Sequence, residues 1–340
     1  MLRSFIVCML MAVIVFCLGS CGRGDSDSEQ VVLYCSVDQA IAEPVIAEFE
    51  KQTGIKVLTR FDTEASKTVG LVRKIRAEKD KPNADVLWSS EIFYTIRLGR
   101  EGLLDPFQCE QFSDWPKTFV DREKLWYAFG LRARVIAYNT NKISANSSPK
   151  CLEDVLTRRW GEDLLMARPE FGTTGGDVAS WFAVYGEDKA VEILKSLRDN
   201  DIRIVSGNST AVRIVAHGQA EVCFTDSDDV YAAQRNGWPI AMNMLRRSGQ
   251  GTLTIPNTAA LIKGGPNREN AEALMKFLLS GNAEKMLLKS DSHNWPVDPV
   301  KIDIADEYCQ YEISEPLKID YQKVVDNLES ALTIAGEILN

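Results

Sequence analysis

The sequence predicts an α/β fold in two lobes, and two observations lead to this prediction. Short apolar segments of strand length alternate with longer segments that are apolar at every third or fourth position. This alternation is typical of a mainly parallel sheet with helices on both faces. The chain has 340 residues, and at about 150 residues per domain its length suits two lobes.

The first part of the body gives three strand and helix pairs. Strands are expected at 31–34, 55–61 and 84–88, and helices at 41–53, 69–75 and 92–101. Gly54 and Gly102 stand where the first and third helices should end. Ligands of parallel sheets bind beyond the carboxyl ends of the strands. Asp38 and Glu91, which follow the first and third strands, are therefore expected to face a ligand.

The rest of the body continues the alternation. Strands are expected at 131–138, 202–205, 221–224 and 252–262, and helices at 177–185, 187–199, 210–217, 266–280, 283–288 and 321–339. The strand that ends at Phe224 opens directly into Asp226, Asp228 and Asp229. Carboxylates on one turn repel one another and resist burial, so water, hydrogen-bond donors or a cation must meet them.

The N-terminal segment has the pattern of a lipoprotein leader. Arg3 precedes an apolar segment at 5–18, and Gly19 and Ser20 lead to Cys21. The segment is shorter than the roughly 20 residues that span a bilayer, which disfavours an uncleaved anchor. We expect residues 1–20 to be removed, Cys21 to be lipidated, and residues 21–30 to form a flexible tether. The body would then lie on the periplasmic or outer cell-surface side, anchored to a membrane by lipid.

The composition and the motif content disfavour a nucleic-acid-binding protein and the common enzyme classes. The net charge is −9, with both signs mixed along the chain, which disfavours nucleic acid as a partner. After Cys21 the chain has five cysteines, so at most two disulfides can form. We find no P-loop, dinucleotide fingerprint, nucleophile elbow or zinc motif. A binding protein rather than an enzyme is expected, and a hydrolase with paired carboxylates is the alternative.

Several segments together resemble one protein family. They read YCS at 34–36, TGIKV at 53–57, ADVLWSSE at 84–91, GLL at 102–104, RVIAYN at 134–139 and PNTAAL at 256–261. In order and spacing, they resemble the periplasmic iron(III)-binding proteins of ABC importers, which have the type II periplasmic binding fold. The resemblance implies that two lobes close on a ligand, and that the protein works as a monomer with a permease and its ATPase. It suggests lobe 1 at 31–130, lobe 2 at 131–240, a return to lobe 1 at 241–300 and a helical tail at 301–340.

The resemblance also suggests metal ligands. Glu91 matches a family glutamate, and Asp38 stands where the family often has histidine. The slot of the family's tyrosine pair is filled by Asp226, Asp228 and Asp229, with Tyr231 slightly later. These oxygen ligands would suit iron(III), Ca²⁺, Mg²⁺ or Mn²⁺. The alternative is that the aspartates only cap the helix that follows them.

A small anion beside the metal, such as carbonate, citrate or phosphate, is also implied. The segment from Thr173 and Thr174 to Gly175 and Gly176 precedes the helix expected at Asp177, and a helix N-terminus attracts anions. Arg134 and Asn208 stand at places similar to the family's anion contacts, and Arg132 is a neighbouring candidate. An ordinary turn and cap is the alternative for the Thr-Thr-Gly-Gly segment. The ligand is thus expected to be iron(III) with an anion, or an organic anion such as a phosphonate or sugar phosphate without metal.

Overall fold

The computed structural model describes residues 29–62, 68–170, 172–247 and 250–339. The leader at 1–20, Cys21 and most of the tether therefore lie outside the described residues. Within the described part, no helix has both the length and the apolar character needed to cross a membrane. The five cysteines beyond Cys21 are all described, and none of them forms a disulfide there.

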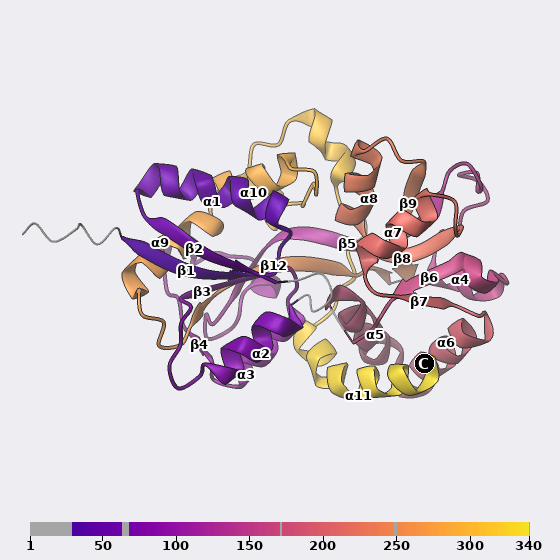
Figure 1. Cartoon of the computed structure of the whole chain (residues 1–340), viewed down its shortest axis with the longest axis horizontal. Helices are drawn as coiled ribbons and strands as arrows, with labels where there is room; N and C mark the ends of the chain where they lie inside the picture. The colour runs from indigo at the N-terminus through magenta and orange to yellow at the C-terminus, as the bar shows by residue number, and fades with distance from the viewer. Residues whose placement is uncertain (1–28, 63–67, 171, 248–249, 340) are drawn as a thin grey trace, which may run out of the picture.

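Strands and helices alternate along the chain as predicted (Figure 1). The strands are β1 (Gln30–Cys35), β2 (Lys56–Phe61), β3 (Val86–Ser89), β4 (Leu104–Asp105), β5 (Tyr127–Asn139), β6 (Leu164–Ala167), β7 (Arg203–Val205), β8 (Val222–Asp226), β9 (Ile240–Met244), β10 (Arg246–Arg247), β11 (Gly251–Thr252) and β12 (Thr254–Ile262). The helices are α1 (Gln39–Thr53), α2 (Val69–Ala77), α3 (Phe93–Arg100), α4 (Leu152–Thr157), α5 (Gly172–Tyr185), α6 (Glu187–Asp199), α7 (Asn208–Ala216), α8 (Ser227–Arg235), α9 (Arg268–Leu278), α10 (Gly281–Lys289) and α11 (Tyr321–Leu339). The α/β prediction is confirmed.

One sheet runs through the whole molecule in the order β2-β1-β3-β12-β5-β8-β6-β7. The pairs β1–β2, β1–β3, β6–β7 and β6–β8 are parallel, whereas β12 and β5 pair antiparallel in the middle. Figure 1 shows these two long strands connecting a half that contains β1 to β3 with a half that contains β6 to β8. The register between β5 and β8 places Arg134 directly opposite Asp226.

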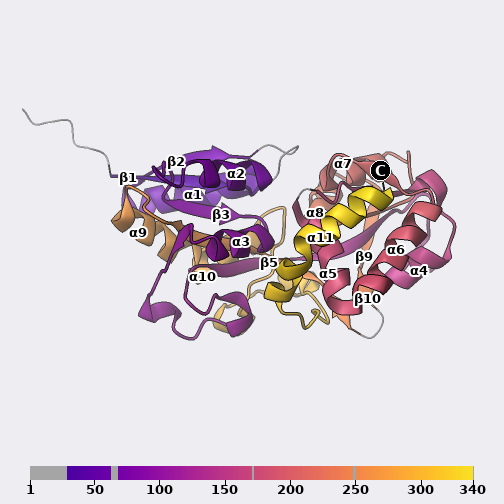
Figure 2. The same ribbon diagram turned by 90° about the horizontal axis from the view of Figure 1, so that it is seen from below.

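The C-terminal helix α11 packs against both halves. It contacts α5 and α6 in one half and α3 in the other, and Figure 2 shows it extending from the middle of the molecule along the second half. Arg100 of α3 donates to the side chain of Gln322 at 2.8 Å and pairs with Asp326 at 2.8 Å. The amphipathic helix predicted at 321–339 is thus present and covers part of both halves.

The start of α5 differs from the prediction. Thr173, Thr174, Gly175 and Gly176 were expected to precede the helix, but α5 begins at Gly172, so these residues form its first turn. Gly172 has a positive φ of 58° and turns the chain into the helix. A Cβ on Gly176 would lie 1.9 Å from the ring of Phe93, so close packing requires this glycine. Long-range packing here overrides the turn preference of the local sequence.

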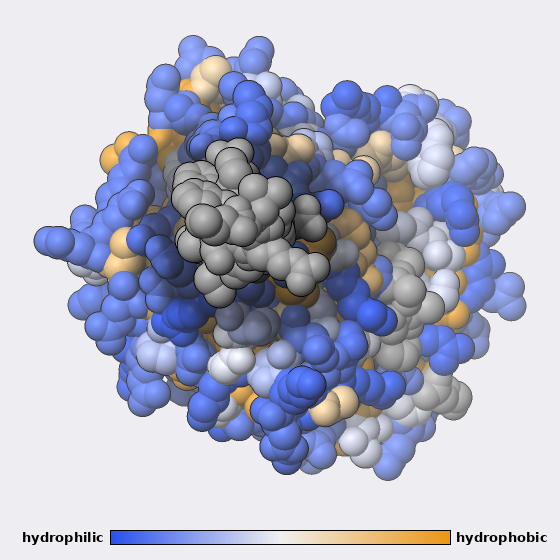
Figure 3. Space-filling view, turned by 60° about the vertical axis from the view of Figure 1, so that its left-hand side comes forward, coloured by the Kyte–Doolittle hydropathy of each residue, from blue (hydrophilic) through white to orange (hydrophobic). Residues whose placement is uncertain are grey.

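The surface carries little exposed apolar area. Among the described residues, the large hydrophobic side chains that are exposed are Leu58 and Val300. The face in Figure 3 is mostly hydrophilic, with scattered small hydrophobic areas.

Candidate functional site

The acidic cluster lies where strand β8 passes into helix α8. Asp226 is the last residue of β8 and the N-cap residue of α8, and Asp228 and Asp229 lie in the first turn of that helix. The helix dipole stabilises carboxylates at this end. Each of the three can offer one carboxylate oxygen so that these oxygens all lie within 4.8 Å of one another. Three hard oxygen donors at this spacing suit a hard metal cation.

Asp226 is almost completely buried, at 2% relative exposure. Arg134 donates from Nη1 to its Oδ1 at 2.8 Å, and Thr173 donates from Oγ1 to its Oδ2 at 2.5 Å. Asn208 donates from Nδ2 to Oδ2 at 3.2 Å, and Arg132 Nη1 lies 3.6 Å from the same oxygen. Burial alone would raise the pKa of Asp226, but the two arginines and the Thr173 hydroxyl lower it below its ordinary value. Asp226 is therefore ionised at neutral pH.

The other two aspartates also have partners. Arg132 Nη1 donates to Asp228 Oδ2 at 2.9 Å. Asp229 accepts hydrogen bonds from the hydroxyls of Ser209 at 2.9 Å and Thr225 at 3.0 Å. The repulsion within the cluster is thus offset by donors on β5, β8 and α7.

Arg132 connects the two halves of the molecule. One of its nitrogens, Nη1, bonds to Asp228, and the other, Nη2, donates to the backbone carbonyl of Ser90, which follows β3. Only 5% of Arg132 is exposed, so solvent screens these contacts weakly. The guanidinium therefore ties the ends of β3 and β8 together.

A small cavity of about 30 Å³ adjoins the cluster. Its walls come from Ser90 and Arg132, from the carboxyl ends of β6, β7 and β8, and from the first turns of α5, α7 and α8: Ser90, Arg132, Ala167, Arg168, Gly172, Thr173, Thr174, Ser206, Gly207, Asn208, Asp226 and Asp229. A cavity needs at least about 10–15 Å³ to hold one water molecule. In this structure the cavity therefore has room for an ion.

The chain matches the family model described as bacterial extracellular solute-binding protein over residues 31–290. It belongs to this family. Iron uptake protein A1 of Synechocystis sp. is 26% identical over 82% of this chain and 81% of its own length. The major ferric iron-binding protein of Neisseria meningitidis serogroup B is 25% identical, with 79% and 81% covered. The structure of the ferric binding protein from Campylobacter jejuni matches with a TM-score of 0.80 at 21% identity, over 91% of this chain and 99% of that one. The predicted two-lobed fold is confirmed.

In this solute-binding protein, the residues predicted to hold an anion do come together. Arg134 is fully buried and donates to Asp177 at 3.2 Å as well as to Asp226. Thr173 receives a hydrogen bond from Asn208 at 2.9 Å, and Thr174 donates to Asn208 at 3.2 Å. Gly175 packs against the backbone of Pro169, as Gly176 does against Phe93. Most of these donors already have an acceptor within the protein.

Asp38 and Glu91 do not belong to the group of three convergent carboxylates. Asp38 is exposed at the N-terminus of α1, and its side chain does not cap that helix. Glu91 is fully buried, and its carboxylate accepts the backbone N–H groups of Phe93 at 2.6 Å and Tyr94 at 3.2 Å, at the start of α3. Burial raises the pKa of Glu91 to about 7. Neither residue joins the oxygens that lie within 4.8 Å of one another.

The side chain of Tyr231 packs against other aromatic side chains and not against the aspartates. Its ring packs edge-on against Tyr311 at 4.9 Å and against His293 at 5.3 Å. Burial raises the pKa of Tyr231 to about 12, so its phenol is neutral at physiological pH. The structure therefore does not bring this tyrosine to the aspartates.

Three further charged or polar residues at or behind the site were not predicted from the sequence. Arg247, fully buried, pairs with Asp177 at 2.5 Å behind Arg134. Arg168 and Ser206 line the small cavity. Nothing in the local sequence marks these residues, because each reaches the site through pairing or packing between distant segments.

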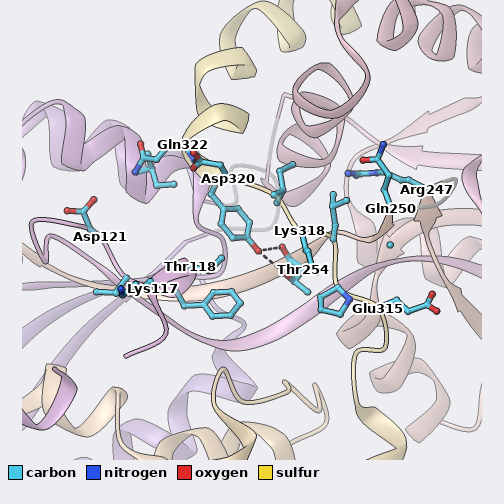
Figure 4. A pocket seen from close by; sticks show the side chains of 18 of the residues that line it. Lys117, Thr118, Asp121, Arg247, Gln250, Thr254, Glu315, Lys318, Asp320 and Gln322 are labelled. Atoms are coloured by element: carbon cyan, nitrogen blue, oxygen red, sulfur yellow. Dashed lines mark hydrogen bonds between the residues drawn. The ribbon is translucent and has the colours of Figure 1, made fainter. Parts of the chain in front are cut away.

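A larger cavity of about 1800 Å³ lies elsewhere in the molecule (Figure 4). Figure 4 shows Lys117 and Asp121 on one side of it and Arg247 and Gln250 on the other. A hydrogen bond of 2.6 Å between the hydroxyls of Thr254 and Tyr321 lies between them. None of its lining residues is shared with the small cavity at the aspartates. It is therefore a second cavity, which borders the buried charges of the site at Arg247.

Proposed function

We propose that this protein is the solute-capturing component of an ABC importer, and that its solute is iron(III). Lipid on Cys21 would hold it outside the cytoplasm, and it would deliver the ion to a permease driven by an ATPase. The division into a lobe of residues 31–130 and 241–300, a lobe of residues 131–240 and a tail is part of this proposal, as is a monomeric state. Relatives named as iron uptake and ferric iron-binding proteins support it.

The observation that carries the proposal is the set of three convergent carboxylates. Asp226, Asp228 and Asp229 each offer one carboxylate oxygen, and these oxygens all lie within 4.8 Å of one another. Three hard oxygen donors that converge in this way favour a hard cation. A cavity of about 30 Å³ beside it admits an ion.

A second candidate is an organic anion such as a phosphonate or sugar phosphate. The N-termini of α5 and α7, together with Arg132 and Arg168, line the same cavity and favour negative charge. Such a molecule is larger than an ion or a water molecule, so it would need a wider cavity than the present one of about 30 Å³. The size of the cavity therefore ranks this candidate below the ion.

A thermal-shift titration tests both candidates. The soluble body from Gly22 onward, stripped of metal, is titrated with chelated iron(III), Ca²⁺, Mn²⁺, phosphonates and sugar phosphates. A ligand at 100 times its Kd adds about 2.7 kcal/mol to the free energy of unfolding. We expect stabilisation by iron(III) that Asp228→Ala abolishes.

Asp188→Ala provides the matched control, because Asp188 is an exposed aspartate in the first turn of α6. It should leave iron binding unchanged. Stabilisation by a phosphonate and not by iron(III) would replace the first candidate with the second.

A further inference from the structure

We infer that the carboxylate of Asp226 is a built-in counter-anion, which makes iron capture independent of any added carbonate, phosphate or citrate. Asp226 would then occupy the position beside the metal that a free anion would otherwise take. That iron binds without an added anion rests on the proposed function, whereas the presence of Asp226 in the anion position can be tested without iron.

The first support is the identity of the donors around Asp226. A guanidinium, the hydroxyl of a residue in the first turn of a helix and a side-chain amide are the groups expected to hold a free oxyanion. Arg134, Thr173 and Asn208 are these groups, and all three donate to the oxygens of Asp226. The anion position expected from the sequence therefore already contains a carboxylate.

The second support is that the backbone fixes this carboxylate in place. Asp226 and Arg134 are directly opposed in the β5–β8 register, where side chains point to the same face of the sheet. A side chain that is already held in the site loses no translational freedom there, whereas a free anion loses its translational freedom when it binds. A free anion must therefore displace a group that competes at a very high effective concentration.

The third support is the space that remains. The cavity next to Asp226 is small, with about 30 Å³, and a cavity needs at least about 10–15 Å³ to hold one water molecule. Carbonate, phosphate and citrate are all larger than water. An added anion therefore has little room in this arrangement while Asp226 holds Arg134, Thr173 and Asn208.

Asp226 can still meet a metal while it holds these donors. Each carboxylate oxygen has two lone pairs, and one oxygen of Asp226 lies within 4.8 Å of oxygens of Asp228 and Asp229. The residue thus connects the arginines to the metal position, as a bridging anion would.

Removal of the carboxylate should open a true anion site. Arg134 Nη2 and Arg132 Nε are buried and have no hydrogen-bond partner among the described residues. In Asp226→Ala these groups, together with the donors released from Asp226, would surround an empty space next to two positive charges. Such a site should bind a small oxyanion.

The test is chemical rescue of the metal-free protein. Wild type, Asp226→Ala and Asp228→Ala are melted in increasing phosphate or carbonate, with ionic strength held constant by chloride. We expect no saturable shift for wild type or Asp228→Ala, and a saturable rise in melting temperature for Asp226→Ala. At 100 times its Kd, phosphate would lower the unfolding equilibrium constant of that variant about 100-fold.

A saturable shift of wild type would overturn the inference, as would a folded Asp226→Ala that phosphate and carbonate leave unchanged. Should Asp226→Ala not fold, Asp226→Ser takes its place. If neither folds in any anion, the wild-type titration decides by the same criterion.

A second arm uses iron(III) taken from a chelate. Wild type should bind it equally with and without carbonate, whereas the folded Asp226 variant should need the anion. Binding by wild type only in the presence of carbonate contradicts the inference. If wild type binds no iron under any condition, the proposed function fails, and the metal-free titrations still decide what occupies the anion position.

Discussion

The free energy of unfolding should fall as the pH rises through neutrality, and Glu284→Gln should remove part of that fall. Glu284 lies in the first turn of α10 with 3% exposure. Its Oε1 accepts the backbone N–H groups of Gly130 and Val297, both at 3.0 Å. No salt bridge to Glu284 occurs among the described residues. Burial, opposed only in part by these two hydrogen bonds, raises the pKa of Glu284 from 4.5 to about 7.

The sign and size of the effect follow from this shift. A carboxyl whose pKa is raised in the folded state binds its proton more tightly there than in the unfolded chain. Its contribution to stability is complete below about pH 4.5 and is lost as the pH rises through about 7. A rise from 4.5 to about 7, at 1.36 kcal/mol per unit, corresponds to about 3 kcal/mol. Glu91, also raised to about 7, should act in the same direction.

Urea denaturation at pH 5, 6, 7 and 8 measures how the free energy of unfolding changes with pH. The amide oxygen of glutamine can accept the same two backbone hydrogen bonds, and the amide does not ionise. We expect Glu284→Gln to exceed wild type by less than about 1 kcal/mol near pH 5 and by about 3 kcal/mol at pH 8. Glu269→Gln, at an exposed first-turn position of α9, is the matched control and should change nothing. Equal pH slopes for wild type and Glu284→Gln would refute the reasoning.

Two further substitutions test the contacts between the halves. Gly176→Ala would place a Cβ 1.9 Å from the Phe93 ring across the interface of α5 and α3, so we expect a loss of about 1–3 kcal/mol in denaturation. The closed arrangement should also be disfavoured, so weaker iron(III) binding by calorimetry is expected, and unchanged affinity would contradict this. Arg132→Gln removes the bonds to Asp228 and to the Ser90 carbonyl and should cost about 3 kcal/mol. A loss below about 1 kcal/mol in urea denaturation would show that Arg132 does not hold the halves together.

The fold was predictable because its signal is local. Apolar periodicity located the strands and most helices, since burial of one face requires it whatever the neighbours are. The start of α5 was not predictable in the same way. Thr173 to Gly176 have low helix propensity, and their glycines serve contacts with Pro169 and Phe93, which lie outside the segment itself.

The site was predictable only as far as strand ends determine it. The position after β8 places Asp226, Asp228 and Asp229 at the start of α8, where one oxygen of each converges with the others. The same rule placed Asp38 and Glu91 near the cleft, but a strand end fixes where a Cα lies and not where its side chain turns. Glu91 turns to the N-terminus of α3, two and three residues further along the chain. The pairing of Arg134 with Asp226 joins positions 92 residues apart and depends on strand register, which no local pattern reveals.

The buried charges of the site form an alternating series. Arg247 pairs with Asp177, Asp177 with Arg134, Arg134 with Asp226, and Arg132 with Asp226 and Asp228. An unpaired ion at such depth costs several kcal/mol, and each member is tolerated because its neighbour has the opposite sign. Asp226, a member of this series, lines the small cavity together with Asp229. A cation that enters there meets carboxylate oxygens, whereas an anion meets like charge. The order of charges, more than any single ligand, therefore favours a metal ion as the solute.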